Sequence, residues 1–484
     1  MAFNIYQAIN YEIRGGLENE IPRIDEARKN LDFYRGDFSQ HPVRIGSKGY
    51  ASNQYPRYSL VMQRCVNVLT NNLYRNGPKR LINGHAEATT WLNGVYRRNN
   101  VDALFQQADR MATVSDVSLF QVSKTADPLK PVKIQLWDAS QFTVWLDPED
   151  QTKFIAVALI DVYNEQRRCR LWTEETVTSY ATTQWRRGQT AGATAFELVS
   201  EDDNDLGFIP FCSVHFDLPI TDFWTTSPGS YLASVNDGMN HALTQNFDSI
   251  NYNLRPIIKG RNVPPEWSPP SPITPGDMWF LPPNVSSEGG GASEPDVEYL
   301  QADPAFVAAS WADFQAYLDH VLEMNGVPPA SIRMVQSAAR SGTSIIAEQA
   351  PLILWAEGRQ RPFACYEDAL ASLVLRMGRE HLGGQDDLEL QTTAAHLAGA
   401  YADPGLALRW PKMYPDLPGP AQDLEDKWSL DNRLASRVTI LMKRENMTRE
   451  EAAAFLDEID ADRAKDAKDG GTPTTPTFEP TPAD

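Results

Sequence analysis

The spacing of hydrophobic residues changes along this chain, and each change predicts a different kind of element. In about the first 110 residues, apolar side chains recur every three or four positions, as they do in amphipathic helices. This pattern predicts helices from Ile24 to Tyr34, ending at Gly36, from Met62 to Leu73, and from about Val101. From about residue 114 to residue 216 the period becomes two, between Asp-Pro, Asn-Glu and Gly turn signals. We therefore expect helices followed by an antiparallel sheet.

Helical spacing returns after the predicted sheet, in two segments with an irregular stretch between them. Apolar residues step by three or four from Leu232 to Leu254. The pattern stops at Pro256, and residues 256–295 are rich in Pro, Gly and Ser; Asp303 and Pro304 then supply an N-cap and a first-turn proline for the next helix. A long irregular excursion between two helices is unusual in a compact domain. We expect it to project from the body.

A third long helical pattern runs from Ser344 to about Glu380 and contains Pro351 and Pro362. Each proline removes a backbone donor and clashes with the preceding turn. We therefore expect this helix to be kinked at both positions.

The remaining part of the chain predicts small elements. A short strand is expected in 406–411 and a helix over 430–441, followed by a helix that opens with a capping box of Thr448 and Glu451. The segment 465–484 is rich in Pro, Thr and Asp, so we expect it to be disordered.

Charge and hydropathy narrow the class of protein. The chain has 484 residues, 44 basic and 64 acidic, for a formal net charge of -20. Proteins that hold nucleic acid tightly are usually basic, so a DNA partner would be repelled on average. No run approaches the roughly 18 apolar residues of a membrane span, and the N-terminus lacks a secretory signal pattern. We expect no membrane association and a cytoplasmic site of synthesis.

No familiar catalytic motif is present in the sequence. It contains no GxxxxGK[ST] phosphate loop, no HExxH pair and no GxSxG elbow. The cysteines are far apart, which favours buried free thiols over a zinc site or disulfides, and single histidines are interpreted as structural. These residues are Cys65, Cys169, Cys212, Cys365, His215, His241 and His320. We expect no enzymatic activity, no cofactor and no metal.

Two acidic clusters leave an enzymatic alternative open. Residues 201–205 and 386–389 are interpreted as solvated turns, because neither has a spaced partner that would complete a metal site. A metal-dependent nuclease remains the rival from another functional class. DNA cleavage that requires a divalent metal would favour it.

Four groups of basic residues are candidates for contact with an anion. The first group is Arg75, Lys79 and Arg80 and the second is Arg167, Arg168 and Arg170; both are interpreted as ordinary surface or intersubunit charges. The other two lie at the tip of the predicted helix pair and in a loop between helices, where a phosphate could meet a projecting side chain. They are Arg255, Lys259 and Arg261, and Arg333 with Arg340. For Arg255 and Lys259 the alternative is compensation of helix C-terminal charge.

The order of these elements resembles the portal (head-tail connector) proteins of tailed double-stranded DNA bacteriophages. The likeness is carried by LDFYRGDF at 31–38, RYSLVMQRCVNVLTNNLY at 57–74 and NNVDALFQQADRMATVSDVSLFQV at 99–122. Its strongest part is the 232–254 helix together with NGVPPASIRMVQSAARSGTSIIAEQAPLILWAEGRQRPF at 325–363. The resemblance implies an α+β portal fold with an α/β wing, a long helical stem, a small clip, a kinked long helix and a helical C-terminal crown.

Carried over to this sequence, the resemblance implies a division of the chain. The wing would occupy 1–229, the stem helices 230–254 and 304–324, the clip 255–303, the tunnel loop region 325–343, the long kinked helix and return to the wing 344–414, the crown 415–464 and the disordered tail 465–484.

The resemblance also implies a function and a set of contact residues. A homo-oligomeric ring, a dodecamer in the family, would form the channel through which double-stranded DNA is packaged and ejected. Its partners would be the terminase large subunit, a head-tail adaptor protein, the major capsid protein and a scaffold. The DNA-facing loop would present Arg333, Gln336, Ser337 and Arg340, and clip and stem contacts would involve Arg255, Lys259, Arg261, Trp267 and Trp279. The alternative is another virion structural protein, a minor capsid or adaptor protein.

Overall fold

A computed structural model of the chain describes most of its length. The described residues are 20–43, 56–125, 127, 130–150, 152–163, 166–182, 196–219, 222–225, 228–253, 257–261, 296–300, 304–328, 342–383, 388–400, 405–411, 427, 430, 436–445 and 449–468. The chain folds as two compact units, each built from separated segments.

The first unit comprises residues 1–70, 107–121 and 134–335. Its helices are α2 (Ile21–Arg35), α3 (Val61–Thr70), the C-terminal part of α5 (Val101–Ser115), α6 (Pro228–Asn253) and α7 (Pro304–Met324). Its largest sheet is antiparallel, in the order β4-β5-β6-β7-β8, with strands Phe142–Leu146, Phe154–Tyr163, Gln166–Trp172, Thr176–Thr182 and Glu197–Asp203.

A three-stranded sheet has the order β3-β2-β9, where β3 is Val132–Asp138, β2 is Val117–Lys124 and β9 is Phe211–His215. β2 pairs with β9 in antiparallel register. The switch to period two therefore predicted the antiparallel strands correctly. Pro210 comes directly before β9, where its missing amide costs no ladder hydrogen bond.

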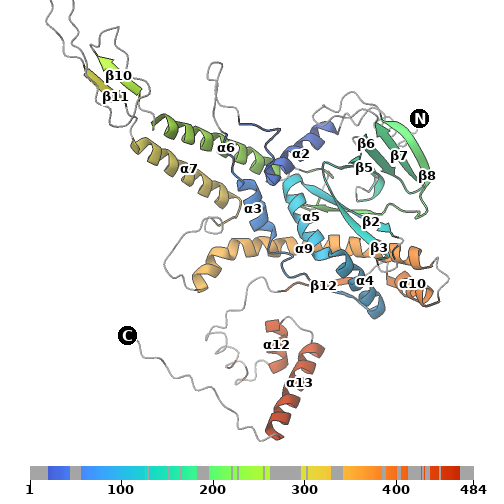
Figure 1. Cartoon of the computed structure of the whole chain (residues 1–484). Helices are drawn as coiled ribbons and strands as arrows, with labels where there is room; N and C mark the ends of the chain where they lie inside the picture. The colour runs from blue at the N-terminus through green and yellow to red at the C-terminus, as the bar shows by residue number, and fades with distance from the viewer. Residues whose placement is uncertain are drawn as a thin grey trace, which may run out of the picture. The chain divides into compact units, whose positions relative to one another are not determined.

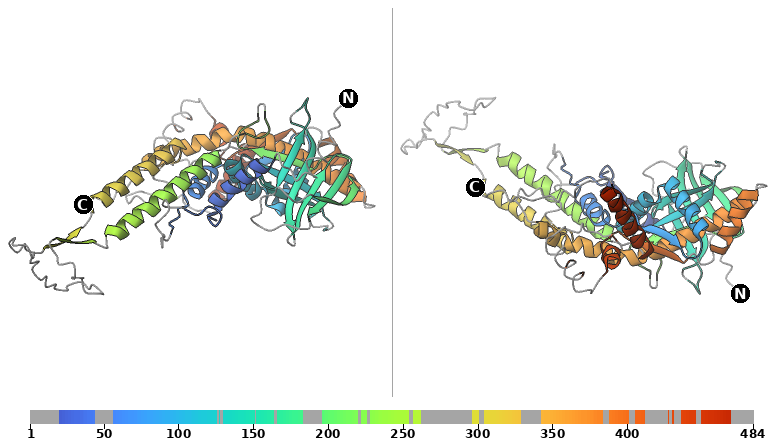
Figure 2. Two further views of the ribbon diagram at one scale, coloured as in Figure 1. Left: turned by 90° about the horizontal axis from the view of Figure 1, so that it is seen from above. Right: turned by 90° about the horizontal axis from the view of Figure 1, so that it is seen from below.

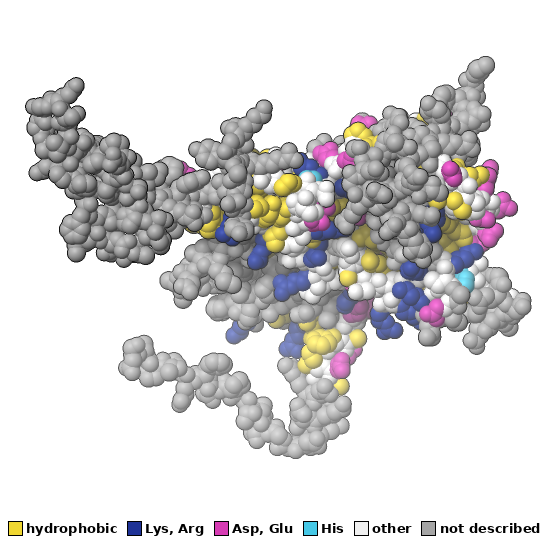
Figure 3. All heavy atoms as spheres, turned by 45° about the horizontal axis from the view of Figure 1, so that its top comes forward, with side chains coloured by type: hydrophobic (Ala, Val, Ile, Leu, Met, Phe, Trp, Pro, Cys, Tyr) yellow, Lys and Arg dark blue, Asp and Glu magenta, His cyan; other side chains and the backbone are white. Residues whose placement is uncertain are grey.

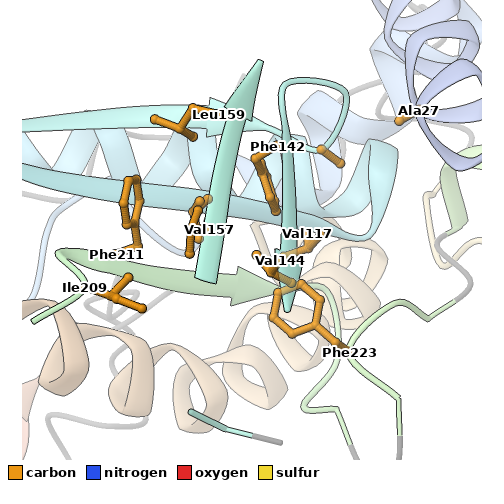
Figure 4. Close-up of a cluster of buried hydrophobic side chains, with 11 residues drawn as sticks. Ala27, Val117, Phe142, Val144, Val157, Leu159, Ile209, Phe211 and Phe223 are labelled. Carbon is orange, nitrogen blue, oxygen red and sulfur yellow. The ribbon is translucent and has the colours of Figure 1, made fainter. Parts of the chain in front are cut away.

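The main core of the first unit lies where the two sheets and α2 meet. Side chains from both sheets interleave there, namely Val117, Leu119, Phe142, Val144, Val157, Leu159 and Phe211. Ile209 and Phe223 from the segments flanking β9 and Ala27 from α2 complete the cluster (Figure 4). Aromatic rings fill this layer by edge contacts, such as Trp172 with Phe211 at 5.8 Å between ring centroids.

The end of α2 shows how the sequence stops a helix. Gly36 adopts a left-handed conformation with φ of 76°, which glycine reaches without a Cβ penalty. The amide of Asp37 then donates to the carbonyl of Asp32 at 2.9 Å. The prediction that this helix ends at Gly36 is confirmed.

The second unit comprises residues 71–106, 122–133 and 336–484. Its elements are the N-terminal part of α5, α4 (Ala86–Asn99), α9 (Gly342–Gly383), α10 (Leu388–Ala400), α12 (Arg437–Glu445), α13 (Arg449–Lys468) and an antiparallel pair of β1 (Lys79–Ile82) with β12 (Leu406–Arg409). Tyr74 and Phe105 stack at its centre, 5.2 Å apart between centroids, and Phe363 meets both rings edge-on.

Three expectations about local structure are corrected. Glu201 to Asp203 belong to the exposed edge strand β8 and Glu389 belongs to α10, whereas both acidic clusters were predicted to be turns. Charged residues suit an edge strand, because they discourage unwanted pairing. Cys365 is exposed, because helical spacing places it on the outer face of α9. Helix α13 continues to Lys468, past residue 465 where the tail was predicted to begin.

Among the described residues, no helix is long and apolar enough to cross a membrane. Acidic side chains gather at the edge of the molecule where β8 lies (Figure 3).

Candidate functional site: the α6–α7 helix pair and its surroundings

Helices α6 and α7 lie side by side, and the β10–β11 hairpin lies beyond their ends (Figures 1 and 2). Helix α6 has 26 residues and α7 has 21. Strand β10 (Ile257–Arg261) pairs in antiparallel register with β11 (Asp296–Leu300). The first and last strands of the predicted excursion therefore pair with each other, and the residues 262–295 between them lie outside the described residues.

A small apolar cluster joins the two helices where they meet the body of the first unit. Val235 and Met239 of α6 pack with Val321 of α7, and Phe314 and Leu318 add a partly buried layer. A hydrogen bond from the Ser310 hydroxyl to the Asn246 side chain continues the contact along the pair.

A ladder of buried polar side chains fastens α6 to the segment before α3. Asn236, Asn240 and Thr244 are spaced by four residues and are at most 1% exposed. The Asn236 side chain accepts from the amide of Met62 at 3.1 Å and donates to the carbonyl of Ser59 at 3.2 Å. Because Met62 is in the first turn of α3, α6 supplies a cap that α3 itself lacks.

The next rungs of the ladder hold the extended chain at 57–59. Asn240 Oδ1 accepts from the amide of Ser59 at 2.7 Å, and Thr244 Oγ1 accepts from the amide of Arg57 at 3.0 Å. The Arg57 guanidinium lies over the Phe247 ring, 4.9 Å from its centroid. The base of α6 is thus held by directional bonds, which fix its register more strictly than apolar packing alone.

The outer face of α7 is exposed and carries apolar side chains among polar ones, such as Asp313 and Glu323. Trp311 is 41% exposed, Tyr317 is 48% exposed and Met324 is 65% exposed. Between them, helical spacing lines up exposed alanines at 305, 308, 309, 312 and 316. Alanine side chains let another helix approach closely. A helix with this face is suited to packing against a further protein surface.

The hairpin strand β10 contains two of the predicted contact residues. Its register places Lys259 opposite Glu298 and Arg261 opposite Asp296. The acidic residues of 296–298 are plain in the sequence, but which residues they stand opposite shows only once the register is known.

The remaining predicted contact residues lie outside the described residues. These are Arg255, Trp267 and Trp279 of the predicted clip, and Arg333, Gln336, Ser337 and Arg340 of the predicted tunnel loop. Pro351 and Pro362 both lie within α9, which is helical without interruption from Gly342 to Gly383.

The second unit contains a buried ion pair that was not predicted. Arg80 and Glu367 are 8% and 0% exposed. Arg80 Nε donates to Glu367 Oε2 at 2.9 Å and Arg80 Nη2 donates to Glu367 Oε1 at 2.6 Å, so the contact is bidentate. Arg80 was interpreted as an ordinary surface or intersubunit charge, and this was wrong. Its neighbours Arg75 and Lys79 are more exposed.

Further contacts complete this network. The Tyr74 hydroxyl donates to Glu367 at 3.1 Å, and Arg80 also donates to Asp102 at 2.7 Å. Burial acts to lower the pKa of Arg80, but its hydrogen bonds and charge interaction with Glu367 outweigh this and raise the pKa. Burial raises the pKa of Glu367 against the effect of Arg80. Gly77 makes room for Asp102, because a Cβ at Gly77 would lie 2.2 Å from its carboxylate. The network joins β1 to α9.

The described residues contain no group of three or more His, Cys, Asp or Glu side chains that could hold a metal ion. The cysteines Cys65, Cys169 and Cys212 are buried. Burial raises the pKa of the Cys65 and Cys212 thiols to about 12, so both stay protonated and unreactive near neutral pH.

Comparison with known proteins gives little to set beside this geometry. No protein-family model matches the sequence, and no curated protein matches it. Among solved structures, a chain from the neck of an empty GTA particle, computed with C6 symmetry, is similar at a TM-score of 0.43 and 12% sequence identity. The match covers 86% of this chain and 93% of that chain.

Proposed function

We propose that this chain is a structural subunit of a phage-like virion and, more specifically, a portal protein. Copies of it would assemble into a ring at one vertex of the capsid, as a dodecamer. Double-stranded DNA would pass through the central channel during packaging and again during ejection. The protein would act without catalytic chemistry of its own.

The observation that carries this proposal is the α6–α7 pair with its terminal hairpin. A projecting pair whose outer helix exposes Trp311, Tyr317 and a row of alanines has an apolar face that the single chain leaves in water. In a ring, each pair would lie against the pair of the next subunit and cover that face. Burying one large aromatic side chain contributes about 1.5–3 kcal/mol, and the contact repeats at every interface.

The acidic charge of the chain suits a channel through which DNA slides better than a site that binds DNA tightly. A net charge of -20 makes DNA binding unfavourable on average, so phosphates would not settle in deep wells while the DNA moves. Arg333 and Arg340, with Gln336 and Ser337, would supply sparse contacts at the narrowest part of the channel. Symmetry would multiply these weak contacts around the ring.

The proposed role distributes the partners over the chain. The hairpin end, with Arg255, Lys259, Arg261, Trp267 and Trp279 in or near it, would dock the terminase large subunit and later a head-tail adaptor protein. The body would contact the major capsid protein and, during assembly in the host cytoplasm, a scaffold. The mature location would be the portal vertex of the virion.

Negative-stain images of the purified full-length chain, with native mass spectrometry, test the proposal. We expect rings with a central hole and a single subunit number. Ala309→Arg on the outer face of α7 should prevent ring formation, whereas Thr90→Arg, at a position of α4 outside that face, should not. A monomer with no ring under any assembly condition would contradict the portal function and favour a minor capsid or adaptor protein.

The loop is tested separately from the ring. Deletion of 336–340 should leave rings intact and reduce DNA packaging or retention. Normal packaging by that variant would remove the loop from the mechanism. DNA cleavage that depends on a divalent metal would instead support a nuclease.

A further inference from the structure

An open groove lies along one edge of the five-stranded sheet in the first unit. Its volume is about 520 Å³. Its walls include Trp145, Leu146 and Trp224, and three carboxylates line it, those of Glu20, Asp147 and Asp222. No lysine or arginine is among the described residues that line it. The groove is therefore lined by apolar and aromatic side chains, with the carboxylates of Asp147 and Asp222 at its rim, because Glu20 is already paired with Arg23.

The sheet edge in this groove is the outer side of β4. The amide of Ile160 donates to the carbonyl of Gln141 at 2.6 Å, and Phe142 stands opposite Leu159 in the register. In an antiparallel ladder, this makes Phe142 and Leu159 a pair that does not exchange hydrogen bonds. Two residues on, Val144 and Val157 must be a pair of the same kind. The amide and carbonyl of Val144 therefore point away from β5, to the open side.

The first part of this edge is already occupied, by a cation from the chain itself. Arg23 of α2 donates to the carbonyls of Ala139 and Phe142 at 2.8 and 2.9 Å. Its guanidinium lies over the Trp224 ring, 3.6 Å from the centroid, and its Nε donates to Glu20 at 2.7 Å. Backbone carbonyls, an indole face and a carboxylate thus combine here to hold one guanidinium.

Val144 and the residues after it continue the same edge beyond Arg23. Val144 lines the groove, and none of the described residues makes a hydrogen bond to its outward-pointing amide or carbonyl. Figure 4 shows Val144 and Phe223 next to each other at this end of the core. An extended segment placed here would pair with Val144 and lie between the two tryptophans.

We propose that this groove binds an extended, cationic segment of a partner protein, which adds to β4 as a short strand and places Lys or Arg side chains beside Asp147 and Asp222. Main-chain pairing would supply general affinity, and the carboxylates would select the charge. A second copy of this acidic chain is a poorer occupant, because its net charge is -20. The proposal does not depend on ring formation, since every residue it uses lies in the first unit.

The test measures binding of a fluorescein-labelled, end-capped hexapeptide that alternates lysine and valine to the full chain, by fluorescence anisotropy. We expect saturable binding that weakens as salt rises. Asp147→Asn combined with Asp222→Asn should weaken it about tenfold, as expected for two partly exposed ion pairs. Asparagine at 147 can still accept from the amide of Glu149, a bond now 2.9 Å long.

Two controls test whether binding depends on the charges of the groove and on main-chain pairing. Glu174→Gln with Glu175→Gln changes the same number of charges in the same unit outside the groove, and should leave the affinity unchanged. A peptide methylated on its central backbone amides should bind at least about tenfold more weakly, because it cannot pair with Val144.

Three results would overturn the proposal. The first is that a peptide with glutamate in place of lysine binds as tightly as the lysine–valine peptide. The second is that the methylated peptide binds as tightly as the unmethylated one. The third is that the Glu174/Glu175 control variant and the Asp147/Asp222 variant bind the peptide equally well. If the chain associates with itself as its concentration rises, and the two Asn substitutions abolish this, then the occupant of the groove is a second copy of this chain and not a partner protein.

Discussion

Replacing Arg80 should destabilise the second unit more than any other removal of a single charge in its network. In Arg80→Met, the Glu367 carboxylate stays 0% exposed and loses both hydrogen bonds from Arg80, which are 2.6 and 2.9 Å long. Breaking a buried ion pair by removing one partner costs about 3–5 kcal/mol. Tyr74 still donates to Glu367. We therefore expect a loss of about 4 kcal/mol in the free energy needed to open the second unit around β1.

The structure also ranks the other members of the network. Glu367→Gln keeps the shape of the side chain and one acceptor, and Asp102 can still compensate the charge of Arg80. We therefore expect this change to lower the opening free energy by about 2 kcal/mol. Asp102→Asn should cost under about 1 kcal/mol, because this side chain is 45% exposed. Replacing both buried partners, as Arg80→Met with Glu367→Leu, should recover most of the loss, since no uncompensated charge remains buried.

Native-state hydrogen exchange at the β1 amides is the suitable assay, because β1 pairs with β12 and unfolding of the whole chain need not be two-state. Arg98→Met is the matched control, an exposed arginine at the end of α4, and should change the opening free energy by less than about 0.5 kcal/mol. A loss below about 1 kcal/mol for Arg80→Met, or no recovery in the double variant, would refute the reasoning.

Three further predictions concern the first unit. Burial lowers the pKa of His215 to about 4 from 6.5, so the unfolded chain takes up a proton before the folded one does. The free energy of unfolding, measured in urea, should therefore fall by up to about 3 kcal/mol as the pH drops from 6.5 to 4, and this fall should shrink in His215→Leu. A Cβ at Gly229 would lie 1.7 Å from a carbonyl oxygen of α5, so Gly229→Ala should lower the free energy of unfolding by more than about 2 kcal/mol. At Gly238 in the same helix a Cβ meets open space, so Gly238→Ala should raise the free energy of unfolding by about 0.5–1 kcal/mol. Thermal unfolding measures both changes. Asn236→Ala should cost about 2 kcal/mol, because it leaves the first-turn amide of α3 buried without its acceptor; equal urea midpoints for this variant and Ser234→Ala, at an exposed position of α6, would count against the polar ladder.

The elements that the sequence predicted well are those set by local rules. The end of α2 follows from a glycine that can adopt a positive φ, and the start of α7 at Pro304 follows from a proline that suits the first turn. The strands of the sheet region follow from alternation and turn residues. None of these depends on knowing which segments meet.

The wrong interpretation of Arg80 depended on a partner far away in the chain. Nothing near Arg80 distinguishes it from Arg75 or Lys79, because its acceptor Glu367 is 287 residues away. A signal existed on the other side of the contact: Glu367 follows Phe363 by four residues on the buried face of α9. A carboxylate on an apolar helix face needs a cation, although the sequence does not say which one.

The sequence by itself determined the α+β composition, the starts or ends of several helices, the pair of long helices α6 and α7, and the acidic character of the chain. Hydrophobic periodicity, capping and charge act over a few residues or over the chain as a whole, so they can be read without a fold. Only the tertiary structure decided that Asn236 caps α3, that Lys259 faces Glu298, and that β4 leaves Val144 on an open edge. Each of these depends on the register between segments, which is set by how they pack together.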